Sequence, residues 1–249
     1  MAKRKANNIF VGVGGWNFAP WRGSYYPKGL VQSQELHYSS RQLTSIEINS
    51  TFYGLQKPTT FKKWHDETPD NFVFSLKAPR FVTNRKLLAS AGSSVERFLG
   101  SGLSELGNKL GPINWQLPPG KQFDAEDLAA FLALLPKKLA GHTLRHALEV
   151  RDESFDTDEF KALARKHEVA VVEAGDSEYP HIEASTASFS YLRVMGTKAS
   201  APKGYTPAGL ERWRDHAQKL ARDGDVFFYF ISGAKERNPL AARALIEAL

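Results

Sequence analysis

The chain has 249 residues, of which 42% are hydrophobic and 24% charged, and this suits one large domain or two small ones. It contains no cysteine and no long apolar run, which excludes disulfide bonds and thiolate metal sites and argues against a membrane span. The net charge of +6 permits an anionic ligand without requiring one.

Eight short β-rich runs follow one another along the chain, and each has the length and residue types of a strand. They are IFVGVG (9–14), SIEIN (45–49), FVFSLK (72–77), PINWQL (112–117), HALEVR (146–151), VAVVEA (169–174), FSYLRV (189–194) and VFFYFIS (226–232).

Segments with helical periodicity lie between most of these runs and after the last one. They are SQELHYSSR (33–41), PTTFKKWHDE (58–67), SSVERFLGSGLSEL (93–106), AEDLAAFLALLP (125–136), DTDEFKALARKHE (156–168), PAGLERWRDHAQKLARDG (207–224) and NPLAARALIEAL (238–249). This alternation is typical of a parallel sheet with crossover helices.

Eight such units predict the α/β class and a single (β/α)8 TIM-type barrel over residues 1–249, with residues 1–8 as a disordered basic N-terminus. An open doubly wound sheet is the structural alternative. A Gly-rich dinucleotide motif does not support it, because VGVGGW continues into an aromatic loop instead of a helix. Two long loops, residues 16–33 and 78–92, are expected to bind ligands.

Strand periodicity indicates which side chains face the barrel axis, because alternate residues of a strand point to opposite faces. In the second run the apolar Ile46 and Ile48 take the helix side, which directs Glu47 and Asn49 inward. The same rule directs inward the polar residues Ser75, Lys77, Asn114, Gln116, Glu149, Arg151, Glu173, Tyr191 and Arg193.

Burying an isolated charge is costly, so these ionisable groups are expected to pair or to serve a ligand. We predict that Glu47 or Glu149 pairs with Lys77, Arg151 or Arg193. A salt-bridge network that only organises the barrel is the alternative to a functional site, although active sites of this fold lie at this same end.

Other signals in the sequence are weaker. Trp16, Trp21, Tyr25 and Tyr26 would either stack on a sugar or base or pack their loop down. The seven histidines lack HExxH or another metal-ligand spacing, so neither a metal nor a cofactor is expected. The chain has no GxSxG elbow and no Walker loop, which leaves serine-hydrolase and P-loop chemistry unsupported.

Several of these runs and loops form longer motifs: VGVGGWNFAPWRGSYYP (11–27), SIEINSTFYGL (45–55), the TP–F–F–K pattern from Thr68 to Lys77, KLGPINWQLPP (109–119), ALEVRDESF (147–155) and YLRVMG (191–196). Together they make the chain resemble the YecE-like family, also called domain-of-unknown-function family 72, over nearly its whole length. The resemblance implies a β/α barrel, and the family's activity is unknown.

On matching positions the resemblance marks Trp16, Tyr26, Glu47, Asn49, Thr51, Phe52, Tyr53, Lys77, Gln116, Glu149, Arg151 and Arg193. Family members commonly carry His-Gly after the strand-seven arginine, where this chain has Met195-Gly196, and an Asn-rich end to strand eight, where it has Phe230-Ile231-Ser232. If that histidine carries a proton in relatives, this chain lacks their chemistry or uses another substrate.

The leading functional hypothesis is an enzyme that acts on a small anionic or phosphorylated, sugar-like ligand at the C-terminal face of the barrel. The candidate catalytic residues are Glu47, Glu149 and Lys77, with either glutamate as general base or acid. The candidate ligand-binding residues are Trp16, Tyr26, Asn49, Tyr53, Gln116, Arg151, Tyr191 and Arg193. These residues select no reaction class.

Three alternatives stay open at this point: nucleic-acid binding through the basic rim, glycoside hydrolysis by Glu47 and Glu149, and a non-catalytic ligand sensor. The basic N-terminus lacks the apolar core of a signal peptide, so we expect a cytoplasmic protein that has no membrane partner. Nothing in the sequence indicates the oligomeric state.

The charges of the predicted loops are unevenly distributed around the barrel mouth. Loops after strands one, two, three, seven and eight carry Arg22, Lys28, Lys57, Arg80, Arg85, Lys86, Lys198, Lys203, Lys235 and Arg237, with Glu236 as their one acid. Loops five and six carry Asp152, Glu153, Asp176, Glu178 and Glu183. We therefore expect a basic arc, and an anion near Arg193 or the loops after strands seven and eight.

Overall fold

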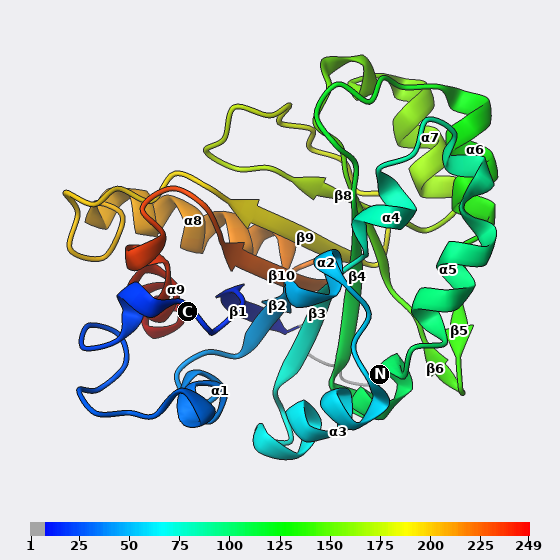
Figure 1. Ribbon diagram of the computed structural model, residues 1–249. Helices are drawn as coiled ribbons and strands as arrows, with labels where there is room; N and C mark the ends of the chain where they lie inside the picture. The colour runs from blue at the N-terminus through cyan, green and yellow to red at the C-terminus, as the bar shows by residue number, and fades with distance from the viewer. Residues whose placement is uncertain (1–7) are drawn as a thin grey trace, which may run out of the picture.

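The computed structural model describes residues 8–249 (Figure 1). The expected disorder of the N-terminus concerns residues 1–7, which lie outside the described residues. Asn8, the last residue of that expected segment, instead joins the end of the sheet. Its carbonyl oxygen accepts from the Val226 N–H at 2.8 Å, and its own N–H donates to Asp225 Oδ1 at 2.9 Å.

Eight parallel strands close into a barrel in the order β1-β2-β3-β4-β7-β8-β9-β10, with β10 paired to β1. Their bounds are β1 Ile9–Gly14, β2 Ser45–Ile48, β3 Val73–Lys77, β4 Leu110–Gln116, β7 His146–Glu149, β8 Ala170–Glu173, β9 Phe189–Val194 and β10 Asp225–Phe230. The predicted barrel is confirmed. The ends of each predicted run lie within two residues of the ends of the corresponding strand.

Helices surround the strands, with α8 and α9 on one side and α5 to α7 on the other in Figure 1. The helices are α1 Glu35–Ser39, α2 Ser50–Tyr53, α3 Pro58–Glu67, α4 Arg80–Thr83, α5 Gly92–Leu99, α6 Ala125–Ala133, α7 Asp158–Lys166, α8 Pro207–Leu220 and α9 Asn238–Ala248. The short 3-10 turns are η1 Ala19–Trp21, η2 Gln32–Gln34, η3 Leu88–Ala91, η4 Leu103–Lys109, η5 Glu153–Phe155 and η6 Lys235–Arg237. Outside the barrel, the two-residue strands β5 Lys138–Leu139 and β6 His142–Thr143 pair with each other. No helix within residues 8–249 is long and apolar enough to cross a membrane.

The predicted helix over residues 93–106 is wrong in its extent, because α5 ends at Leu99. Gly102 adopts a φ of +112°, a left-handed conformation that favours glycine and stops the helix before η4 begins. Between β8 and β9, residues 174–188 cross over without forming a helix.

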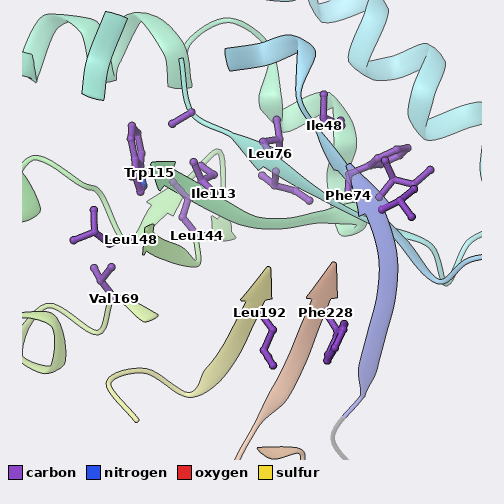
Figure 2. Packing of buried hydrophobic residues seen from close by; sticks show 14 of the residues in the cluster. Ile48, Phe74, Leu76, Ile113, Trp115, Leu144, Leu148, Val169, Leu192 and Phe228 are labelled. Atoms are coloured by element: carbon purple, nitrogen blue, oxygen red, sulfur yellow. The ribbon is translucent and has the colours of Figure 1, made fainter. Parts of the chain in front are cut away.

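Most of the hydrophobic core lies between the strands and the helices. Phe74 and Leu76 of β3, Ile113 of β4 and Leu148 of β7 are fully buried in this layer (Figure 2). A second apolar cluster fills the barrel interior, with Val73, Ala147, Ala170, Val172, Phe189 and Phe227 among its members. The two clusters confirm the strand alternation expected for β3, where Phe72, Phe74 and Leu76 face the helices.

The inward orientation predicted for Glu173 is wrong. In the β8–β9 pairing Glu173 lies opposite Leu192, which belongs to the helix-facing layer. Its carboxylate accepts from His216 Nε2 of α8 at 2.9 Å. The run VAVVEA is apolar on both faces, so the pattern could not distinguish the axis side from the helix side.

The pair between Glu173 and His216 predicts a small pH dependence of stability. The hydrogen bond to Glu173 raises the pKa of His216, so the pair contributes its full stability below the ordinary histidine pKa and loses it as the pH rises through the folded-state pKa. Urea unfolding should therefore show His216→Gln destabilised by up to about 1 kcal/mol at pH 5.5 and by less at pH 8.5. An equal loss at both pH values would contradict the pairing.

Candidate functional site

The interior below the barrel mouth changes from apolar to polar toward the C-terminal ends of the strands. Above the apolar cluster, the hydroxyl of Tyr229 lies 2.7 Å from Ser45 Oγ and 2.6 Å from Ser75 Oγ, and all three side chains are buried. These hydroxyl contacts form a layer that separates the apolar interior from the charged residues above it.

Arg193 of β9 is at the centre of a buried ion network. Its Nη2 donates to Glu47 Oε1 at 3.0 Å, and its Nη1 donates to Glu149 Oε2. Glu149 Oε1 also accepts from Arg151 Nε at 2.9 Å and Nη2 at 2.7 Å. Glu47 and Glu149 are 0% exposed and Arg193 is 4% exposed. The predicted pairing of the glutamates with arginines is confirmed, whereas Lys77 forms no ion pair with a described residue.

Neutral side chains add further hydrogen bonds to the network. Tyr191 donates its hydroxyl to Glu47 Oε2 at 2.7 Å, and Asn114 Nδ2 donates to Glu149 Oε2 at 3.2 Å. Gln116 Oε1 accepts from both Arg151 and Arg193, at 2.9 and 3.1 Å. Both oxygens of each glutamate are therefore engaged in hydrogen bonds within the protein.

The network shifts the pKa values of its members in opposite directions. Burial alone would raise the pKa of Glu149, but the positive charges of Arg193 and Arg151 outweigh it and lower that pKa. Burial would lower the pKa of Arg193, but Glu149 and Glu47 raise it. Glu149 thus remains ionised. The ion pairs of the network join two arginines, Arg151 and Arg193, to two glutamates, Glu47 and Glu149.

A cavity of about 540 Å³ lies over this network at the barrel mouth. Among the described residues that line it, Lys77, Arg193 and Lys235 are cationic and none is acidic. The other lining residues are Gly14, Gly15, Trp16, Asn17, Phe18, Ile48, Asn49, Ser50, Tyr53, Gln56, Trp64, Ile231, Ser232 and Asn238. The cavity size suits a small-molecule ligand.

Lys77 ends β3 and extends into this cavity. Its Nζ lies 4.0 Å from the centre of the Phe52 ring, and its backbone carbonyl accepts from Thr51 Oγ1 at 2.7 Å. Burial and then the charge of Arg193 lower the pKa of Lys77 to about 8. A lysine with this pKa can exchange a proton near neutral pH.

The chain after β10 brings two further polar groups to the cavity. Ser232 adopts a φ of +57°, which is strained for a residue other than glycine, and such strain is found at functional sites. Asn238, the first residue of α9, donates from Nδ2 to the Ser232 carbonyl at 3.2 Å and accepts from Thr197 Oγ1 at 2.7 Å. These bonds fix the turn, with Lys235 beside it on the cavity wall.

The start of the first loop is shaped by a close approach between β1 and the end of β2. A Cβ on Gly14 would lie 2.6 Å from Asn49 Nδ2, so a larger residue at position 14 would displace that amide. Asn49 lines the cavity. This contact gives a physical reason for the glycine in the VGVGG segment.

The aromatic residues predicted at the site divide into two groups. Trp16 and Tyr53 line the cavity, and Tyr53 is 71% exposed. Tyr26, predicted to bind a ligand, is instead 1% exposed, and its hydroxyl donates to the Trp16 carbonyl and contacts Ser39 Oγ. Trp21 and Tyr25 are buried beside it, so these three residues pack the loop.

Three other predicted ligand contacts lie outside the cavity wall. Tyr191 is 1% exposed below the ion network, and Gln116 is 6% exposed within it. Arg151 stacks on Tyr179, with its guanidinium carbon 4.1 Å from the ring centre. The loop over residues 78–92 contributes no lining residue either, whereas residues 16–18 of the first long loop do.

Sequence reasoning missed several lining residues, including Gln56, Ser232 and Asn238. The position of Asn238 was a usable signal, because loops after the last strand of a barrel commonly contribute to its site. The comparison with the Asn-rich end of strand eight in relatives pointed to the position of Ser232, whereas Gln56 had no such signal.

No group of three or more His, Cys, Asp or Glu side chains within residues 8–249 is arranged to hold a metal ion. The basic arc predicted for the rim is partly neutralised: Arg22 Nε pairs with Glu35 at 2.7 Å and Lys203 lies 3.9 Å from Glu247. Inside the cavity, the cations on the wall are Lys77, Arg193 and Lys235.

Comparison with known families identifies one match over nearly the whole chain. The family described as "Protein of unknown function DUF72" matches residues 10–249. The UPF0759 protein YecE of Escherichia coli K12 is 28% identical over 150 residues, which cover 59% of this chain and 50% of that protein. The match thus spans about half the length of YecE. The UPF0759 protein YunF of Bacillus subtilis is 24% identical and covers 89% of this chain and 88% of its own.

Solved structures show the same fold. A DUF72 family protein from Thermotoga maritima superposes with a TM-score of 0.77 at 21% identity, covering 97% of this chain and 99% of its own. D-psicose 3-epimerase from Clostridium cellulolyticum H10 gives a TM-score of 0.54 at 12% identity and 97% coverage of both chains. These identities establish a shared barrel fold and no more.

Proposed function

The chain belongs to the DUF72 family of proteins of unknown function, and within it we propose that this protein is an enzyme for a small anionic, sugar-like ligand bound at the barrel mouth. The observation that carries the proposal is the cavity of about 540 Å³ lined by Lys77, Arg193 and Lys235 without a carboxylate among its described residues. A hollow lined by one sign of charge attracts a ligand of the other sign.

An unpartnered donor supports an anionic ligand. Arg193 Nε is buried and has no hydrogen-bond partner within residues 8–249, although its other two nitrogens are engaged. A buried donor left without a partner costs about 1–3 kcal/mol. An anionic oxygen bound in the cavity would offset that cost.

The neutral part of the cavity supports a polyhydroxyl ligand. Asn17, Asn49 and Gln56 line it, and a carboxamide group can both donate to and accept from sugar hydroxyls. Trp16 adds an aromatic surface. Sugar epimerases share the barrel fold, and we propose by analogy that this chain also acts on a sugar-like molecule.

The catalytic group in this proposal is Lys77, and the two glutamates hold Arg193 in place. Lys77 lines the cavity and has a pKa lowered to about 8, whereas Glu47 and Glu149 are fully buried with their oxygens engaged. Glycoside hydrolysis by that carboxylate pair is not supported for the same reason.

Calorimetric titration of inorganic phosphate and ribose 5-phosphate tests the proposal. Lys235→Ala should weaken binding about tenfold, because one charge–charge contact near a surface is worth on the order of 1.4 kcal/mol. Lys198→Ala is the matched control, since Lys198 is an exposed loop lysine outside the cavity.

Equal affinity in wild type and Lys235→Ala, or no binding at millimolar ligand, would sink the proposal. A single-stranded oligonucleotide titrated in parallel distinguishes the nucleic-acid alternative. Tight binding that falls steeply with salt, and is equal in both variants, would favour that alternative.

A further inference from the structure

Lys77 differs from the other charged residues at the ends of the strands. Glu47, Glu149, Arg151 and Arg193 are all joined by ion pairs of 3.0 Å or less. Lys77 Nζ has neither an ion pair nor a hydrogen bond with any of residues 8–249, and its neighbour is the face of the Phe52 ring. Both glutamates are paired with arginines, and neither forms an ion pair with the lysine.

This environment makes part of the lysine a neutral amine near pH 7. Burial, and after it the like charge of Arg193, lowers the pKa of Lys77 to about 8. At pH 7 about one molecule in ten then carries the neutral amine, compared with about one in three thousand for an ordinary lysine of pKa 10.5. Desolvation and a neighbouring cation are the two features that activate a lysine as a nucleophile.

The backbone of Lys77 is fixed, and its side chain faces an open volume. The residue ends β3 and pairs with Asn114 of β4. Its backbone carbonyl accepts a hydrogen bond of 2.7 Å from Thr51 Oγ1. The cavity in front of it also contains Ser50, Tyr53 and Lys235. A ligand in this cavity would contact the amine of Lys77, and Arg193 and Lys235 would bind its anionic group.

Resting on the proposed function, we propose that Lys77 forms an imine with the carbonyl carbon of a small anionic aldehyde or ketone bound in this cavity. The neutral amine adds to the carbonyl carbon and gives a carbinolamine. The carbinolamine takes up a proton and loses water, leaving a protonated C=N bond. Overall, a lysine ammonium and a carbonyl compound give a protonated imine and one water, without an oxidant or reductant.

The ligand's anionic group is positioned by Arg193 and Lys235. Arg193 Nε is the buried donor without a partner, and Lys235 Nζ lies over Phe18 of the neighbouring loop after β1, 4.3 Å from its ring centre. The substrate class is therefore a short carbonyl compound that bears a phosphate or carboxylate.

Borohydride trapping with dihydroxyacetone phosphate tests this inference. The full chain is incubated with the probe at pH 7, reduced with sodium borohydride, digested and analysed by mass spectrometry. A secondary amine adduct at Lys77 should exceed that at any other lysine at least tenfold, and its formation rate should rise with pH and level off above about pH 8. Lys77→Arg should lose the adduct.

Lys63→Arg is the matched control, because Lys63 is 64% exposed and pairs with Glu67 at the surface. This variant should keep the full Lys77 adduct. Labelling of Lys77 no faster than that of Lys63 in wild type would overturn the imine.

A parallel calorimetric titration with phosphate separates this inference from the proposed function. Phosphate binding that depends on Lys235, without an adduct at Lys77, would overturn the imine and leave the anion site standing. Absence of both would overturn both, and an adduct at Lys77 that phosphate competes away would support both.

Discussion

Arg193→Met is expected to lower the free energy of unfolding by about 3–5 kcal/mol at pH 7, because it leaves two carboxylates buried without their shared cation. Glu47 and Glu149 are 0% exposed and both accept hydrogen bonds from Arg193. Since the pKa of Glu149 is lowered in the folded chain, its ion pairs contribute stability above the ordinary carboxyl pKa. That contribution is lost as the pH falls through the folded-state pKa.

Urea denaturation followed by circular dichroism measures this loss. Arg212→Met is the control, since Arg212 is 59% exposed in its pair with Asp176 and should cost less than about 1 kcal/mol. The triple variant Glu47→Gln, Glu149→Gln, Arg193→Met should recover part of the loss, because removing Arg193 together with both carboxylates costs less than leaving the two carboxylates without it. A loss below about 1 kcal/mol for Arg193→Met would show that the network is not buried as described.

Lys77→Met should have the opposite sign and raise the free energy of unfolding by about 2–3 kcal/mol at pH 7. The pKa of Lys77 is lowered from 10.5 to about 8 by folding, so between these values the unfolded chain binds more protons. Below pH 8 the folded wild type is therefore destabilised by the full free energy of burying the Lys77 ammonium ion. This destabilisation disappears as the pH rises from 8 to about 10.5. The advantage of Lys77→Met should shrink over the same window.

Lys109→Met is the matched control for a buried lysine. Lys109 Nζ donates to the carbonyls of His65 and Thr68 at 2.6 and 2.7 Å, so its loss should destabilise the chain. Thermal unfolding of both variants at pH 7 and pH 10.5 gives the comparison. If Lys77→Met were destabilising at pH 7, Lys77 would be a structural residue and not an activated amine.

Strand periodicity predicted the barrel and most of the ion network because polar and apolar residues alternate strictly in the informative strands. In β2 and β3 the apolar residues face the helices, so alternation directs Glu47 and Lys77 toward the barrel axis. The prediction failed for Glu173, where alanine and valine occupy both faces of β8. Periodicity indicates a face only where the two faces differ in polarity.

The depth of a side chain along the barrel axis could not be predicted in the same way. Tyr191 and Arg193 share one face of β9, but the two-residue separation places Tyr191 in the layer below the network and Arg193 at the cavity. The inward orientation was therefore predicted correctly for both residues. The predicted ligand contact is supported for Arg193, which lines the cavity, and not for Tyr191.

Loop positions were the least predictable part of the site. Trp16 and Tyr26 belong to the same aromatic loop, yet one lines the cavity and the other is buried against Ser39. That difference depends on the packing of the loop against α1, which no local pattern encodes. The contribution of Asn238 similarly depends on the left-handed turn at Ser232. Met195 and Ile231 belong to the apolar interior next to the cavity, so neither supplies a proton-transfer group there.

Soaking a crystal of the full chain with ribose 5-phosphate tests whether the barrel mouth holds an anion site. We expect electron density for the sugar phosphate inside the cavity, with a phosphate oxygen within hydrogen-bond distance of Arg193 Nε or Lys235 Nζ. Density confined to the outer loops, with the cavity free of the ligand at saturating concentration, would contradict it.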